Sequence, residues 1–203
     1  HPMGPTSPEI LRRIGVGAIR HMPGWRYIPE KDGKYRFSDH DIRYALAGMD
    51  QMNSVKVGLV PPRYRRPDGR FADHAAVNEF LRQMLAAWGG SIRDWEIENE
   101  PNASGHMPDK PEDYAEITRT VSRELRAADP SNLIYGISGT STFVPWMKKT
   151  LDSGADMDAV SWHTYTTPEQ PDKAGLPDML REARKVASKY NRFFNSETGI
   201  LTA

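Results

Sequence analysis

The stretch IRDWEIENEPN, residues 92–102, alternates apolar with acidic positions and then reaches a proline. A period of two is typical of a β-strand, in which successive side chains point to opposite faces of a sheet. Pro101 cannot donate a hydrogen bond to a neighbouring strand, so we expect the strand to end there and to leave Glu100 at the rim of the sheet. On such a strand Asn99 lies on one side, and the other side carries three carboxylates: Glu96, Glu98 and Glu100.

Segments with the period of an α-helix alternate with strand-like runs along the chain. The clearest helical pattern, in residues 77–88, places apolar side chains at intervals of three and four residues. The predicted strands lie at 16–20, 54–60, 92–102, 133–138, 158–165 and 192–199. The helices that precede them lie at 8–15, 38–53, 77–88, 111–128, 144–153 and 177–190. Because parallel neighbours need a crossover connection and a helix supplies it, this order predicts a parallel sheet.

Two architectures build a parallel sheet from such units: a (β/α)₈ barrel and an open, doubly wound sheet. The glycine-rich turns with which open sheets bind dinucleotides or phosphates are absent from the sequence. Polar, aromatic and charged residues instead gather where several predicted strands end: Arg20, Trp25, Arg63, Tyr64, Asn99, Glu100, Ser141, His163, Tyr165 and Glu197. Functional groups at the carboxyl ends of several strands are typical of a (β/α)₈ TIM barrel, so we predict a single barrel domain over residues 1–203.

Composition limits the classes of partner and cofactor. The chain has 27 basic and 27 acidic residues, which gives no general reason to expect a nucleic-acid partner. It has no cysteine, which excludes disulfides and zinc–thiolate sites, and no apolar run long enough for a membrane span. The histidines and acids show no metal-ligand spacing, so we expect neither a metal nor a cofactor. These features favour neither a secreted nor a cytoplasmic location.

A second glutamate, Glu197, lies at a predicted strand end in the run FFNSETG, residues 193–199. Two carboxylates at the rim of one sheet suit the hydrolysis of a glycosidic bond. One carboxylic acid protonates the departing oxygen, and the other carboxylate attacks the anomeric carbon or activates water. Because a lone glutamate at a strand end is usually a solvated residue, the hypothesis rests on the pair of Glu100 and Glu197.

Three segments, in this order and spacing, resemble a known group of enzymes: ENEPN at 98–102, SWHTY at 161–165 and NSETG at 195–199. They resemble the clan A retaining glycoside hydrolases, which are (β/α)₈ barrels with catalytic glutamates at the ends of their fourth and seventh strands. Within that clan, WEIENEPN and GWRYIPEKDGKYRFSDHDI are most similar to family 39, the group of β-xylosidases and α-L-iduronidases.

The resemblance implies a retaining hydrolase that cleaves O-glycosidic bonds in a β-linked oligosaccharide or polysaccharide. Glu100 would be the general acid/base and Glu197 the nucleophile. Asn99 would bond the 2-hydroxyl of the sugar, and Tyr165 and Arg20 would contact the nucleophile. The implied substrate-binding residues are Asn99, His163, Tyr165, Arg20 and Trp25.

The same resemblance identifies the first predicted strand with strand two of the barrel and the last with strand seven. We therefore expect a barrel trimmed at both ends, without its first and last strands. A homo-oligomer that closes the two open edges is one expectation from such a barrel, and a non-catalytic, carbohydrate-binding or inactive fragment is the alternative function. Besides the missing strands, the sequence differs from the family pattern at Glu98, because close family members often carry an aromatic residue at that position.

Other features have both a structural and a functional interpretation. Glu96 and Glu98 are expected to pair with inward-facing basic residues such as Arg20 or to lie near the polar mouth of the barrel, because an isolated charge inside a barrel is costly. The run PPRYRRPDGR, residues 61–70, would bind an acidic sugar through its arginines or would be a solvated loop. Trp162 lies in the middle of a predicted strand and is expected in the core, whereas Trp25 would stack on a sugar face.

Overall fold

A parallel sheet in chain order forms the centre of the structure. The computed structural model describes residues 10, 13–15, 18–21, 30–32, 34, 35, 53–57, 74–88, 90, 92–103, 110–140, 143–166 and 175–200. The strands of the sheet are β1 (Ala18–His21), β4 (Asn53–Val57), β5 (Asp94–Glu96), β6 (Leu133–Gly139), β7 (Ala159–Thr166) and β8 (Phe193–Ile200). Each strand pairs in parallel with the next of these along the chain, so the predicted parallel sheet is confirmed.

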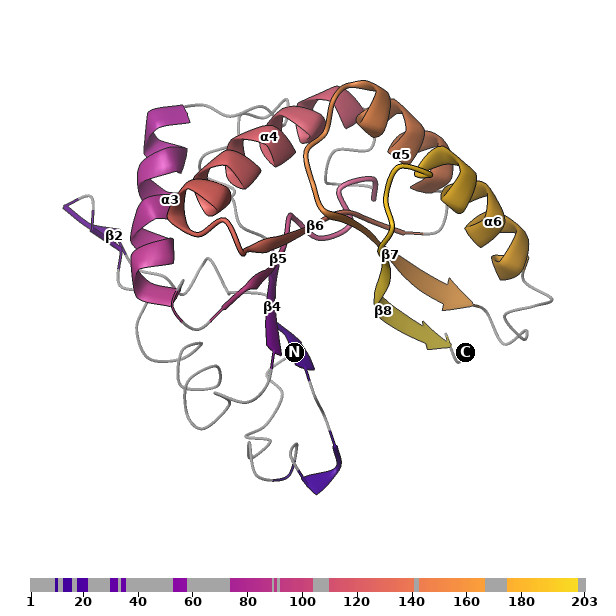
Figure 1. The fold of residues 1–203 in the computed structure, drawn as a ribbon, viewed down its shortest axis with the longest axis horizontal. Coiled ribbons are helices and arrows are strands. Elements are labelled where there is room, and N and C mark those ends of the chain that lie inside the picture. The colour runs from indigo at the N-terminus through magenta and orange to yellow at the C-terminus, as the bar shows by residue number, and fades with distance from the viewer. Residues whose placement is uncertain are drawn as a thin grey trace.

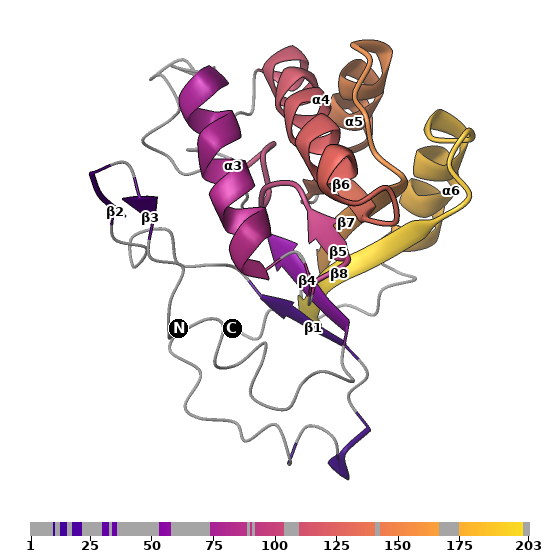
Figure 2. The ribbon, with the colours of Figure 1, turned by 60° about the vertical axis from the view of Figure 1, so that its left-hand side comes forward.

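The helices that connect the later strands all lie on one face of this sheet. They are α3 (His74–Trp88), α4 (Pro111–Ala128), α5 (Phe143–Asp152) and α6 (Leu176–Val186). Figures 1 and 2 show them side by side in chain order. A doubly wound sheet carries helices on both faces, so this arrangement is that of a barrel wall. Of the helix predicted at 38–53, residues 38–52 lie outside the described residues, and Asn53 is the first residue of strand β4.

The hydrophobic core lies between the helices and the sheet. On α3 the apolar stripe expected from the sequence is buried: Val77, Phe80, Leu81, Met84 and Leu85. From the sheet, Trp95 points toward the helices, since its Nε1 donates to Oδ1 of Asn132 over 3.0 Å. Asn132 in turn donates from Nδ2 to the carbonyl of Leu125 near the end of α4. Trp162 is buried as expected and packs against Phe193, with ring centroids 5.6 Å apart.

Contacts on the other face of the sheet require it to be curved. Glu96 of β5 accepts hydrogen bonds of 2.6 Å from Nε of Arg20 on β1 and from Oγ of Ser196 on β8. In the order of the sheet, β8 is three strands away from β5. Neighbouring strands are about 4.8 Å apart, so a flat sheet would separate β8 from β5 by roughly 14 Å, beyond the reach of a serine side chain. The sheet therefore bends around Glu96, as a barrel wall does.

The strand β5 is shorter than the sequence predicts. It ends at Glu96, although the N–H of Ile97 still donates to the carbonyl of Tyr135. Glu98 and Glu100 have φ angles of +64° and +46°, in the left-handed region where strand alternation cannot continue. The prediction that the strand runs to Pro101 is therefore wrong, because the backbone turns before the proline is reached.

A small antiparallel hairpin, β2 (Glu30–Lys31) and β3 (Lys34–Tyr35), was not predicted. Its signal in the sequence is the Asp-Gly pair at 32–33, which is typical of two-residue hairpin turns. Tyr35 attaches the hairpin to α3: its ring packs edge-on against Phe80 at 5.0 Å between centroids, and its N–H donates to Gln83.

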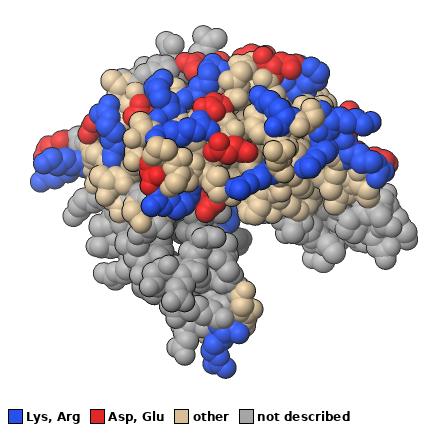
Figure 3. Space-filling model, in the orientation of Figure 1, with Lys and Arg blue, Asp and Glu red and all other residues tan. Residues whose placement is uncertain are grey.

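The outer surface over the helices is covered by charges of both signs (Figure 3). Some of these charges pair within one helix, such as Lys148 with Asp152 on α5 at 2.5 Å. Among the described helices, none combines the length and apolar character that a bilayer crossing would require.

Candidate active site

Arg20 connects the ends of three strands on the concave side of the sheet. Besides its bond to fully buried Glu96, it donates from Nη2 to Oδ1 of Asn99 over 2.8 Å. The same Nη2 lies 3.1 Å from Nε2 of His163 on β7. The expected pairing of Glu96 with Arg20 is thus confirmed. The expectation that Asn99 lies on the other side of the strand is wrong, because the turn after Glu96 brings both side chains to one guanidinium.

His163 links this cluster to Glu100. The side chain of His163 is completely buried, and its Nδ1 lies 2.9 Å from Oε1 of Glu100. The N–H of Glu100 donates to the carbonyl of Ser138 on β6, so both the main chain and the side chain of Glu100 are held. Glu100 lies beyond the carboxyl end of β5, and one quarter of its side chain remains exposed.

The backbone of Glu197 lies beside His163. The two Cα positions are in register between β7 and β8, whereas one step earlier Trp162 is in register with Asn195. The strand β8 therefore carries one extra residue, Ser196, in a β-bulge. The hydroxyl of Ser196 is the group that binds Glu96, so the bulge directs it into the concave side.

A second bulge lies on the other neighbour of β7. It falls between Ile137 and Gly139 of β6 and again adds a serine, Ser138. The Oγ atoms of Ser138 and Ser161 are 3.1 Å apart, and the carbonyl of Ser138 is the acceptor for the N–H of Glu100. The irregularity in β6 thus supplies the backbone contact that positions Glu100.

The hydroxyl of Tyr114 fills the gap that these irregular strand ends leave in the ladder. From helix α4 it donates to the carbonyl of Ile97 over 2.8 Å and accepts from the N–H of Ile137 over 3.0 Å. Ile137 has a φ of +79°, which is costly for a β-branched residue. Tyr114 therefore bridges β5 and β6 at the point where both backbones leave the regular strand conformation.

The structure brings together four of the residues predicted to form the site: Arg20, Asn99, Glu100 and His163. Tyr165 is partly buried, two positions after His163 on β7. Of Glu197 only the backbone position is described, and Trp25, with residues 61–70, lies outside the described residues.

Sequence reasoning did not single out Ser138, Ser196 or Tyr114. Bulges have no periodic signature, and Tyr114 falls on the apolar face of α4, where its position is typical of a core residue. The contact of Ser196 with Glu96 joins residues 100 positions apart, so no local pattern could reveal it. In the described part of the chain, no group of three acidic or histidine side chains is placed to hold a metal ion.

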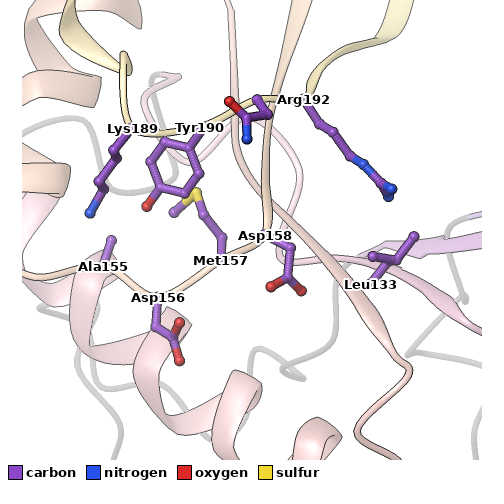
Figure 4. Close-up of a pocket in the computed structure, with 9 residues that line it drawn as sticks. Leu133, Ala155, Asp156, Met157, Asp158, Lys189, Tyr190 and Arg192 are labelled. Carbon is purple, nitrogen blue, oxygen red and sulfur yellow. The ribbon is translucent and has the colours of Figure 1, made fainter.

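A cavity of about 500 Å³ lies at the opposite end of the strands (Figure 4). Its lining includes Leu133, Asp158 and Arg192, which stand at the starts of β6, β7 and β8. In barrels the amino-terminal ends of the strands serve stability, and the chemistry takes place at their carboxyl ends. We therefore do not assign the active site to this cavity.

An ion pair beside this cavity holds α4 to the start of β7. Arg126 donates from Nη1 to Asp156 over 2.5 Å and from Nη2 to Asp158 over 2.9 Å. Burial lowers the pKa of Arg126, but the bonds to Asp158 and Asp156 outweigh this effect, and the pKa is raised. This pair stabilises the base of the barrel wall.

No family model and no curated protein matches the chain. Solved structures do match it. A GH39 β-xylosidase from Caulobacter crescentus has 20% identity and a TM-score of 0.66, over 96% of this chain and 49% of its own. A family 39 glycoside hydrolase from Bacteroides cellulosilyticus has 19% identity and a TM-score of 0.72, and the match covers 95% of this chain and 45% of the hydrolase. A thermostable mutant of a xylanase from Cellvibrio japonicus has 15% identity and a TM-score of 0.66, over 96% and 65%.

The chain has the fold of the family 39 glycoside hydrolases. The likeness expected from the sequence is thus confirmed for the fold, including the (β/α) barrel class. The chain spans about half the length of the family 39 structures that it matches. Its parallel strands with helices outside them form part of such a barrel wall.

Proposed function

We propose that the chain carries the active site of a retaining glycoside hydrolase, with Glu100 as general acid/base and Glu197 as nucleophile. The observation that carries the proposal is the register of β7 and β8. It sets the backbone of Glu197 beside His163, whose side chain contacts Glu100. Retention requires about 5–5.5 Å between the two carboxyl groups, a separation that residues around one histidine can provide.

The reaction would proceed by two displacements. A carboxylate oxygen of Glu197 forms a bond to the anomeric carbon while the bond to the departing oxygen breaks and Glu100 gives that oxygen its proton. Water then attacks the glycosyl ester, gives its proton to Glu100 and releases the carboxylate of Glu197. Arg20 and Asn99 would contact the sugar or the nucleophile at the same strand ends, with Tyr165 and Trp25 completing the pocket.

The similar structures guide the choice of substrate. Two of them are described as a β-xylosidase and a xylanase, so aryl β-xylosides are the first substrates to test, followed by β-glucosides, β-galactosides and β-glucuronides.

Two variants test the roles of the glutamates. Glu100→Ala should lose roughly 10²–10⁴-fold in kcat/KM for a poor leaving group, and much less in kcat/KM for a nitrophenolate, which needs no protonation in the first step. Glu197→Ala should lose turnover of both substrates. Glu182→Ala, an exposed position on α6, is the control and should keep full activity. Full activity in Glu197→Ala would refute the assignment, and saturable sugar binding without turnover by the unaltered chain would favour the non-catalytic alternative.

A further inference from the structure

We propose that Glu96 and Arg20 fix the tautomer of His163, so that its Nδ1–H is the donor to Glu100. The role in catalysis rests on the function proposed above, but the tautomer itself does not. Glu96 and Arg20 are positioning residues in this proposal, because they act on Glu100 only through the imidazole ring.

The assignment follows from the donors and acceptors around the ring. A guanidinium group has only N–H donors, so Nε2 of His163, 3.1 Å from Nη2 of Arg20, must be the acceptor. A neutral imidazole with an unprotonated Nε2 carries its proton on Nδ1. Nδ1 lies 2.9 Å from Oε1 of Glu100, which can accept that proton in a hydrogen bond. In a doubly protonated ring, the Nε2–H of His163 would face an N–H of Arg20, and two donors cannot form a hydrogen bond.

Glu96 holds Arg20 in the orientation that this assignment needs. One carboxylate oxygen of Glu96 accepts from Nε of Arg20, and the other accepts from the hydroxyl of Ser196, both over 2.6 Å. Rotation of the carboxylate would break one of these bonds in a completely buried site. Because a guanidinium is planar, the bonds of Nε to Glu96 and of Nη2 to Asn99 fix its plane and therefore the donor that meets His163.

In the proposed hydrolase, this arrangement would direct the proton of Glu100. His163 occupies Oε1, which leaves Oε2 to exchange a proton with the glycosidic oxygen. With the opposite tautomer, Nδ1 would present a lone pair to Glu100 and would accept the acid's proton in a hydrogen bond, away from the substrate. Arg20 and Glu96 thus keep the ring from competing for that proton.

The test is nitrogen-15 NMR of the histidine rings in the intact chain. The chain has six histidines, and a His163→Gln variant assigns the signals of His163 by their loss. We expect Nδ1 of His163 to have the shift of a protonated ring nitrogen and Nε2 that of an unprotonated one. In Arg20→Met, which cannot donate, we expect the two shifts to exchange or to average. A wild-type ring protonated on Nε2, or an Arg20→Met ring that keeps the proton on Nδ1, would overturn the proposal.

Two further variants serve as controls for this test. Arg126→Met removes another partly buried arginine that binds two carboxylates, but at the far end of the strands, and should leave the His163 shifts unchanged. If Arg20→Met does not fold because it leaves Glu96 buried without a partner, the double variant Arg20→Met with Glu96→Gln removes both charges and should show the same change in tautomer. Because the readout needs no turnover, a chain without glycosidase activity could still confirm the tautomer, so the two proposals can fail separately.

Discussion

Glu96 is the residue on which the concave side of the barrel wall depends. It is fully buried, and each of its oxygens accepts a hydrogen bond from a different edge of the sheet. A buried ion pair of this kind adds little net stability over an apolar pair, but removal of one partner leaves an uncompensated charge. The position therefore tolerates substitution poorly, although it is not expected to touch a substrate.

Replacement of Glu96 by Gln should lower the free energy of unfolding by about 3 kcal/mol, because Arg20 loses its counter-charge in a largely buried place. Urea denaturation followed by circular dichroism measures the change. Glu79→Gln is the matched control. It removes the carboxylate that binds Arg82 over 2.6 Å on the exposed surface of α3, and it should lower the free energy of unfolding by less than about 1 kcal/mol. Equal losses in the two variants would contradict the account of Glu96.

Tyr135 should make the free energy of unfolding decrease with pH in the alkaline range. Its hydroxyl donates to Asp94 over 2.8 Å across β5 and β6. Burial, followed by this hydrogen bond, raises the pKa of Tyr135 above its ordinary value of about 10. The fold thus favours the protonated phenol, and this contribution is complete below about pH 10 and is lost as the pH rises toward the pKa of the folded state.

We therefore expect the free energy of unfolding of the wild type to fall more steeply above about pH 10 than that of Tyr135→Phe. Urea titrations at a series of alkaline pH values measure both slopes. Parallel slopes would show that the phenol does not have the raised pKa.

At the scale of elements, the ends of β5 and β6 are built from irregular backbone. Glu98, Glu100, Ile137 and Ser138 all have positive φ angles, and a tyrosine from α4 replaces a ladder contact between the two strands. Backbone strain of this kind persists only where the surroundings hold it in place. Helix α4 is therefore a support for the strand ends as well as a cover for the core.

Tyr114→Phe should destabilise the chain by about 2 kcal/mol, because the carbonyl of Ile97 and the N–H of Ile137 both lose a buried partner. In the proposed enzyme it should also lower kcat more than it changes KM, since Glu100 would lose part of its support. Tyr190→Phe removes the hydroxyl of another buried tyrosine, far from these strand ends, and serves as the control. An unchanged stability in Tyr114→Phe would mean that the bridge is not formed.

For the whole molecule, the order of the elements could be predicted from the sequence, whereas the geometry of the strand ends could not. The span of α4 agrees with the predicted range of about 111–128, because its apolar face has a strong period and a proline begins it. The pairing of Glu96 with Arg20 was predicted from the cost of a buried charge. The end of β5 was misplaced because Glu98 and Glu100 occupy the left-handed region without glycine, and the two serine bulges arise from pairing with a neighbouring strand, which no local pattern reveals.

The curvature of the sheet brings these separate segments together. It allows Arg20 and Ser196, from the two outermost strands, to meet Glu96 in the middle. At the same strand ends, Glu100 contacts His163, and the backbone of Glu197 is in register with His163. The central claim is therefore that Glu197, as nucleophile, and Glu100, as general acid/base, catalyse a retaining reaction on either side of His163.

The most direct test of that claim is covalent trapping. The chain is incubated with 2-fluoro aryl glycosides, beginning with the xyloside, and intact-mass spectrometry is followed by mapping of the modified peptide. The account predicts a mass increase of one fluorosugar, located on Glu197 and absent from the Glu197→Ala variant. An adduct on another carboxylate such as Glu98, or turnover that inverts the anomeric configuration without any adduct, would contradict it.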